Sequence, residues 1–174
     1  MRSIRPWAAH LVTGLRLATA LPLVWALWSG FFGLAAALVL AAIASDIADG
    51  RIARQMRAES SLGRWLDHGA DIAFLLAGLG ALAAMGLVPA FVPLAIAGAF
   101  AFYVVDSLRR SDTRTLIGSR LGHLSGIFNY AILVGAVADE AVGRVLPEAV
   151  RTLCFASVPL YSAAAVAARV MAGR

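Results

Sequence analysis

Six apolar stretches of membrane-spanning length follow one another along the chain, separated by short polar segments. A helix needs roughly 20 apolar residues to cross a bilayer, with a range of about 17–25. The pattern therefore predicts an all-α protein, a bundle of six transmembrane helices. The predicted helices cover approximately residues 10–28, 31–54, 65–88, 89–107, 121–142 and 151–170.

Composition supports a membrane location for the whole chain. The sequence is 61% hydrophobic and 14% charged, whereas soluble domains are about 45–50% apolar and about 25% charged. We therefore expect an integral membrane protein with a single domain over residues 1–174. The one cysteine, Cys154, excludes an intramolecular disulfide and lies in an apolar run, which predicts a buried, inert thiol.

The arginines predict the orientation of the bundle. Thirteen of the fifteen fall in segments on one side of the predicted helices, and only Arg144 and Arg151 fall on the other. Because cytoplasmic loops are enriched in basic residues, the arginine-rich side is predicted to be cytoplasmic, with both termini inside. The net charge of +5 does not indicate nucleic-acid binding, since no soluble basic domain is available for it.

Four aspartates interrupt this apolar pattern. Asp46 and Asp49 close the second apolar stretch, and Asp67 and Asp71 open the third. A carboxylate at mid-membrane costs about 2.5–3.5 kcal/mol on insertion scales, less near the interface, and such residues mark functional sites by default. An ion-pair network with neighbouring arginines is the simplest structural alternative.

Helical periodicity gathers these acids and several small residues onto two stripes. A helix advances about 100° per residue, so residues three, four and seven apart share a face. The stripes contain Asp46, Asp49, Gly50 and Ala53 in the second helix, and Gly63, Asp67 and Asp71 in the third. We expect the stripes to face each other at a shallow cytoplasmic depth. Divalent cations, which prefer carboxylate oxygens, would offset the repulsion and suit a diphosphate ligand.

The same residues form a recognisable signature, Asp-x2-Asp-Gly-x2-Ala-Arg-x8-Gly-x3-Asp-x3-Asp, running from Asp46 to Asp71 with Arg54 inside it. This pattern resembles that of the CDP-alcohol phosphotransferase family of membrane enzymes. In size and layout the chain is similar to bacterial phosphatidylglycerophosphate synthases. The resemblance implies an active site at the cytoplasmic ends of helices two and three, in a bacterial inner membrane. A homodimer is also expected, in keeping with the abundant Gly and Ala.

The resemblance also implies a role for each signature residue. Divalent metal, Mg²⁺ or Mn²⁺, would be bound by Asp46, Asp49 and Asp67, with Asp71 also touching metal and acting as the general base. The CDP donor site would be formed by Asp49, Gly50, Ala53, Arg54 and Gly63. The implied reaction transfers a phosphatidyl group from CDP-diacylglycerol to an alcohol acceptor and releases CMP.

The expected acceptor is glycerol 3-phosphate, and its candidate contacts lie on the cytoplasmic side. They are Thr13, Arg16, Arg109, Arg110, Arg114 and Arg120. Positive-inside topology alone would also explain most of these arginines. His123 and Ser125 stand where phosphatidylglycerophosphate synthases carry Lys and Thr, so inositol phosphate, another alcohol or a lipid remains an alternative acceptor.

Two interpretations of another class remain: an ion or proton transporter, and a catalytically silent scaffold. A proton relay needs polar groups across the bilayer, and the non-cytoplasmic halves of the predicted helices are nearly free of ionisable residues. Among other polar residues, His68 is expected to be a packed or solvated neighbour of Asp67. His123 and Asn129 are expected to hydrogen-bond between helices.

Overall fold

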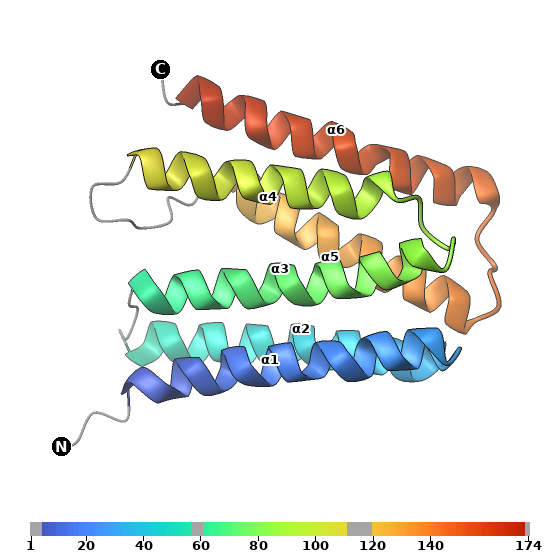
Figure 1. Ribbon diagram of the computed structural model, residues 1–174, viewed down its shortest axis with the longest axis horizontal. Coiled ribbons are helices and arrows are strands. Elements are labelled where there is room, and N and C mark those ends of the chain that lie inside the picture. Colours follow the sequence, from blue (N-terminus) through green and yellow to red (C-terminus); the bar gives the residue numbers. More distant parts are fainter. Residues whose placement is uncertain (1–4, 57–60, 111–119, 173–174) are drawn as a thin grey trace.

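The chain runs back and forth along one axis, so that each helix points in the opposite direction to the one before it (Figure 1). The computed structural model describes residues 5–56, 61–110 and 120–172, and these residues form six helices. The all-α prediction is therefore confirmed. The helices are α1 (Arg5–Trp28), α2 (Phe32–Met56), α3 (Ser61–Ala84), α4 (Phe91–Arg110), α5 (Arg120–Ala141) and α6 (Glu148–Ala172).

The third helix ends four residues earlier than its apolar run predicted. It stops at Ala84, and the chain then turns through Gly86, whose φ is 73°. The amide of Leu87 donates to the carbonyl of Leu82 at 2.9 Å. A left-handed glycine followed by such a bond closes a helix, because it satisfies a terminal carbonyl that the helix leaves unpaired. Hydropathy carries no information on this turn, so the prediction ran on to Val88.

Two helix starts also differ from the apolar pattern, both next to prolines. The fourth helix begins after Pro89, at Phe91, and the sixth begins directly after Pro147, at Glu148 rather than Arg151. Proline has no amide hydrogen to lose at the first turn of a helix, so it favours helix starts. The acidic Glu148 suits the positive end of the α6 dipole, which explains why a charged residue outside the apolar run is helical.

The helices have the character of membrane spans. Four of them are long and apolar enough to cross a bilayer, within residues 65–84, 91–109, 121–141 and 148–171. In α1 and α2 the described apolar parts are shorter, Ala18–Trp28 and Phe32–Ile47. Large apolar side chains such as Leu21, Leu94 and Leu160 are mostly exposed on the outside of the bundle, as expected for a surface that faces lipid. The protein is an integral membrane protein.

The buried core draws apolar side chains from all six helices. It contains Leu23, Leu27, Phe74, Leu79 and Leu133, all fully buried. α1 packs most extensively against α3 and also against α2, while α4 packs against α6. In the described residues, α2 and α3 each pack closely against α1 and α5 rather than against each other. These shared neighbours fix the relative positions of the two helices that carry the aspartates.

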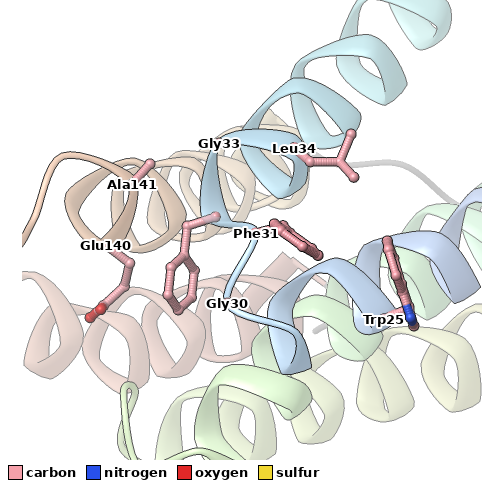
Figure 2. Close-up of a pocket in the computed structure, with 8 residues that line it drawn as sticks. Trp25, Gly30, Phe31, Gly33, Leu34, Glu140 and Ala141 are labelled. Atoms are coloured by element: carbon pink, nitrogen blue, oxygen red, sulfur yellow. The ribbon is translucent and has the colours of Figure 1, made fainter.

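The two ends of the bundle differ in character. The beginning of α1, the end of α2 and the beginning of α3 lie at one end, together with the end of α6 (Figure 1). At the other end, short turns join the helices, and an open pocket of about 660 Å³ is lined by Trp25, Phe31 and Glu140 among others (Figure 2). Glu140 is paired with Arg144 at 2.7 Å there. This pocket lies far from the aspartates and takes no part in their site.

Candidate active site

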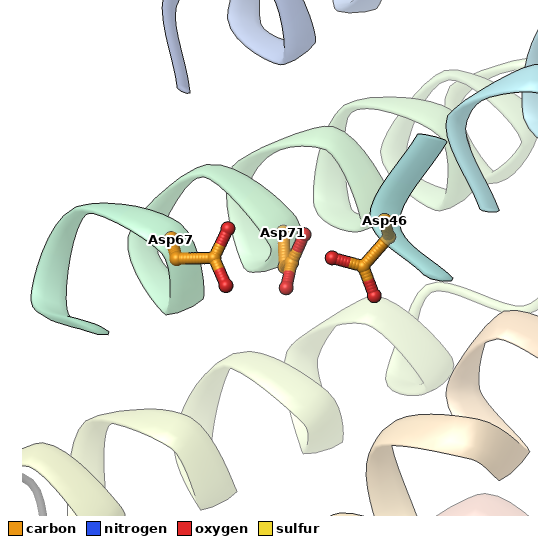
Figure 3. A group of neighbouring side chains, drawn as sticks. All are labelled: Asp46, Asp67 and Asp71. Carbon is orange, nitrogen blue, oxygen red and sulfur yellow. The ribbon is translucent and has the colours of Figure 1, made fainter. Parts of the chain in front are cut away.

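Three carboxylates from two helices meet at the end of the bundle where α2 ends and α3 begins. Asp46 extends from α2, and Asp67 and Asp71 extend from α3 (Figure 3). One oxygen of each carboxylate lies within 4.8 Å of an oxygen of the others. In the view of Figure 3, Asp71 lies between Asp67 and Asp46. The predicted meeting of acids from the two helices is observed for these three side chains.

Local structure explains this arrangement. Asp67 and Asp71 are four residues apart, so one face of α3 presents both of them. α2 runs in the opposite direction, so Asp46, ten residues before its last residue, comes close to Asp71, ten residues after the first residue of α3. Because α1 and α5 each contact both α2 and α3, they hold these two helices in a relative position that lets the carboxylates meet.

The charges of the cluster define what it can hold. Asp46 is exposed, and Asp67 and Asp71 are partly buried. Three ionised carboxylates at this separation repel one another. The repulsion is stronger here than in water, because the effective dielectric constant is lower near a protein. A divalent cation removes that repulsion, and an all-oxygen donor set suits Mg²⁺, Mn²⁺ or Ca²⁺. The three aspartates therefore fit a divalent metal ion.

The remaining signature residues belong to the same two helices. Asp49, Gly50, Ala53 and Arg54 lie in the continuous helical backbone of α2, and Gly63 lies in α3. Unbroken helix over these positions preserves the spacing on which the two stripes depend. The side chains of these residues lie outside the described part of the structure.

The candidate acceptor residues are only partly described. Arg109 is an exposed residue in the last turn of α4. Arg114 lies outside the described residues. Thr13, Arg16, Arg110 and Arg120 belong to helices, but their side chains are outside the description. The structure thus places Arg109 at the same end of the bundle as the aspartates and brings no described arginine of this group into contact with them.

Tyr130 is a neighbour of the cluster that the sequence did not reveal. Its hydroxyl, on α5, donates a hydrogen bond to the backbone carbonyl oxygen of Asp71 at 3.4 Å. The side chain is partly buried. Nothing in the spacing of α5 alone indicates this contact, because it depends on how α5 crosses α3.

A second polar cluster joins α4 and α6 beside the site. Arg169 is only 9% exposed and donates from Nε to Oδ2 of Asp106 at 2.5 Å, and from Nη2 to the hydroxyl of Ser107 at 2.7 Å. Its guanidinium lies 4.5 Å from the ring centroid of Tyr103. The same ring stacks on His68 of α3, with centroids 6.4 Å apart. The cluster therefore reaches from α6 through α4 to the residue next to Asp67.

Three expectations about polar residues have clear outcomes. His68 is a packed and exposed neighbour of Asp67, as predicted. Asn129 hydrogen-bonds between helices, since its side-chain oxygen accepts from the Tyr161 hydroxyl at 2.5 Å. The expectation of a buried thiol at Cys154 was wrong: the residue is exposed on α6. An apolar run in a membrane protein has a lipid-facing side as well as a core side, and Cys154 lies on the former.

The comparison with known families identifies the class of protein. The family model described as CDP-alcohol phosphatidyltransferase matches residues 7–172. The chain therefore belongs to the CDP-alcohol phosphatidyltransferase family. No protein of curated function matches the chain significantly.

Membership gives the reaction in general form. The protein is a transferase of phospholipid synthesis that moves a phosphatidyl group from CDP-diacylglycerol to an alcohol acceptor. This outcome favours the enzyme interpretation over the transporter and the silent scaffold. The family uses a divalent metal, which agrees with the fit of the Asp46, Asp67 and Asp71 carboxylates.

Proposed function

We propose that this protein transfers the phosphatidyl group of CDP-diacylglycerol to glycerol 3-phosphate and releases CMP. The observation that carries the proposal is the convergence of Asp46, Asp67 and Asp71, whose carboxylate oxygens lie within 4.8 Å of one another. Carboxylate oxygens gathered in this way are ligands that a divalent cation prefers, and the ion would offset their mutual repulsion. A cation held there can meet a diphosphate whose lipid tails remain in the bilayer.

Each signature residue takes a part in donor binding. Mg²⁺ or Mn²⁺ would be held by Asp46, Asp49 and Asp67, with Asp71 alongside; when bound, the ion neutralises the diphosphate and stabilises the departing CMP. Arg54 binds a phosphate oxygen through its guanidinium. Gly50, Ala53 and Gly63 leave room for the cytidine group to approach the helix backbones closely.

Asp71 acts as the general base. Its carboxylate accepts the proton of the acceptor hydroxyl, and that oxygen forms a bond to the phosphorus that carries the diacylglycerol. The bond from this phosphorus to the oxygen of CMP breaks, and CMP leaves with the electron pair. Asp71 is suited to this role because it lies between the other two acids in Figure 3, with Tyr130 next to its backbone.

The phosphate of the acceptor is held by basic residues at the same end of the bundle. Arg109 is exposed in the last turn of α4, where its guanidinium is available to an anionic ligand. The other contacts of this group are Thr13, Arg16, Arg110, Arg114 and Arg120. Inositol phosphate, another alcohol or a lipid acceptor is the alternative, because His123 and Ser125 replace residues usual in glycerophosphate-specific relatives.

The proposal also covers the orientation of the protein in the membrane and its oligomeric state. The beginning of α1 and the end of α6 lie at the same end as the aspartates, and the arginine excess of that side supports a cytoplasmic location for it. Water-soluble CMP and acceptor are then exchanged with the cytoplasm. We assign the protein to a bacterial inner membrane as a homodimer.

An acceptor panel tests the proposal. The purified protein is reconstituted in lipid with CDP-diacylglycerol and Mg²⁺ or Mn²⁺, and CMP and lipid products are measured by mass spectrometry. We expect CMP and phosphatidylglycerophosphate with glycerol 3-phosphate, and little turnover with inositol phosphate. A new lipid formed only with another acceptor contradicts the acceptor assignment, and no CMP with any acceptor contradicts the transfer itself.

A further inference from the structure

The hydroxyl of Tyr130 is a polar group at the boundary between the aspartate cluster and the apolar core. It donates to the main-chain carbonyl of Asp71 at 3.4 Å, across the contact between α5 and α3. One turn further along α3, Phe74 and Leu75 are already buried in the core. A hydroxyl placed in apolar surroundings is costly unless it is hydrogen-bonded. Its partner here is the main chain of the residue assigned as the base.

The direction of the helices explains why the tyrosine reaches this carbonyl. α3 and α5 both begin at the aspartate end and run the same way. Side chains on a helix tilt toward its N-terminus, so a long side chain on α5 extends back toward the aspartates. A helical carbonyl has a second lone pair, so that of Asp71 can accept this bond in addition to the bond within α3.

A second contact holds the same two helices together deeper in the bundle. A Cβ added at Gly78 would lie 3.0 Å from Cδ1 of Leu133 and 3.2 Å from Cδ2 of Leu23. Gly78 is two turns from Asp71, and Leu133 is one turn from Tyr130. α3 is therefore held against α5 at two levels, by close packing at Gly78 and by a hydrogen bond at Asp71. Two contacts along one helix restrict its rotation about its own axis, and that rotation decides where the Asp71 carboxylate points.

We propose that Tyr130 is a positioning residue for Asp71: its hydroxyl fixes the α3 turn so that the Asp71 carboxylate meets the acceptor hydroxyl. This inference rests on the proposed function, in which Asp71 is the base. We expect the effect on proton transfer, because the described bond of the Tyr130 hydroxyl reaches the main chain of the base, Asp71. A small misplacement of a catalytic group is costly in rate.

The structure supplies a matched control in Tyr161. Its hydroxyl also makes an interhelical bond to α5, donating to Oδ1 of Asn129 at 2.5 Å, and it is partly buried. This bond links α5 to α6 and involves no aspartate. Changing either tyrosine to phenylalanine removes one oxygen and leaves the ring, so the two variants differ mainly in which helix loses its hydrogen bond.

The experiment compares Tyr130→Phe with Tyr161→Phe in reconstituted protein. For Tyr130→Phe we expect kcat to fall about three- to tenfold, the loss of one neutral hydrogen bond expressed as a rate. We expect KM for CDP-diacylglycerol to stay near the wild-type value, and the thermal midpoint to fall less than in Tyr161→Phe, because the Tyr161 bond is the shorter of the two, 2.5 Å against 3.4 Å. For Tyr161→Phe we expect kcat to stay near wild type while the thermal midpoint falls.

Several outcomes would overturn the inference. One is a wild-type kcat in Tyr130→Phe, and another is an equal fall of kcat in both variants. A third is a fall of kcat in Tyr130→Phe that is accompanied by a larger fall of the thermal midpoint than in Tyr161→Phe, or by a higher KM for the donor. Asp71→Asn separates the two levels of the proposal. An inactive Asp71→Asn with a fully active Tyr130→Phe rejects the role of Tyr130 alone, whereas an active Asp71→Asn rejects the assigned base.

Discussion

Arg169 in α6 and Asp106 in α4 form a buried ion pair near the aspartate end of the bundle. Nε of Arg169 lies 2.5 Å from Oδ2 of Asp106, and the two side chains are 9% and 13% exposed. Ser107 accepts a second bond from the same guanidinium, and Tyr103 lies beneath it. A charge in this position is stable only with its partner, because it has left most of its water. The pair therefore joins α4 to α6 where neither helix could hold the charge alone.

Replacing Arg169 with Leu should destabilise the protein strongly. The change removes the Arg169 guanidinium from beside the Asp106 carboxylate, and breaking a buried pair costs about 3–5 kcal/mol. We expect a fall in the thermal midpoint of about 10 °C in detergent or lipid. Thermal unfolding of the purified variant measures it. The double variant Asp106→Leu with Arg169→Leu should recover part of the loss, since no unpaired charge remains.

The matched control for this prediction is Arg144→Gln. Arg144 pairs with Glu140 at 2.7 Å, but its side chain is 47% exposed. Exposed ion pairs contribute about 0.2–1 kcal/mol, so the thermal midpoint should hardly move. If Arg144→Gln and Arg169→Leu lower the midpoint equally, burial does not set the strength of the Arg169 pair.

Adding a methyl group to two neighbouring glycines of α3 should give opposite results. At Gly78 a Cβ would meet Leu133 and Leu23 at 3.0 and 3.2 Å, whereas at Gly80 it meets nothing within 4 Å. Ala is preferred to Gly inside a helix by about 1 kcal/mol. Gly80→Ala should therefore be neutral or stabilising, and Gly78→Ala should be destabilising by about 1 kcal/mol because two leucine side chains must move. Denaturation of the two variants side by side measures the difference, and equal stabilisation by both would argue against close packing at Gly78.

Removal of divalent metal should abolish transfer reversibly. Chelation removes the ion that Asp46, Asp67 and Asp71 would hold for the donor diphosphate. Activity should return on addition of Mn²⁺ or Mg²⁺. Asp46→Asn and Asp67→Asn should raise the metal concentration for half-maximal activity by at least about tenfold. Metal titration of the turnover rate measures the shift. Full activity after chelation, or unchanged titrations, would show that the cluster does not hold the ion.

Hydropathy predicted the helices well because a lipid-facing or buried helix must be apolar over its whole length. It could not predict where a glycine turn ends a helix, as at Gly86, or which side of an apolar helix faces lipid, as at Cys154. The acids Asp46, Asp67 and Asp71 were predictable because helical spacing puts residues of one helix on a common face. Contacts between helices that are far apart in the sequence could not be predicted, because they depend on how those helices cross.

Arg169 and Tyr130 show most clearly what the sequence patterns could not predict. Arginine counting treated Arg169 as a topology signal, whereas the structure buries it against Asp106. The sequence did contain one hint of this pair. Asp106 and Arg169 each stand near the end of an apolar run, and a charge in such a position needs a partner. Tyr130 gave no such hint, because a tyrosine in an apolar helix is common and its partner is a backbone carbonyl.

The central claim is that phosphatidyl transfer takes place at the aspartate cluster with Asp71 as the base. The most direct test is CMP release by Asp71→Asn in reconstituted protein with CDP-diacylglycerol, glycerol 3-phosphate and Mn²⁺, beside Glu140→Gln as a carboxylate control at the other end of the bundle. We predict that Asp71→Asn loses at least about 10²-fold in turnover while still binding CDP-diacylglycerol, and that Glu140→Gln stays active. Turnover of Asp71→Asn at the wild-type rate would contradict the account.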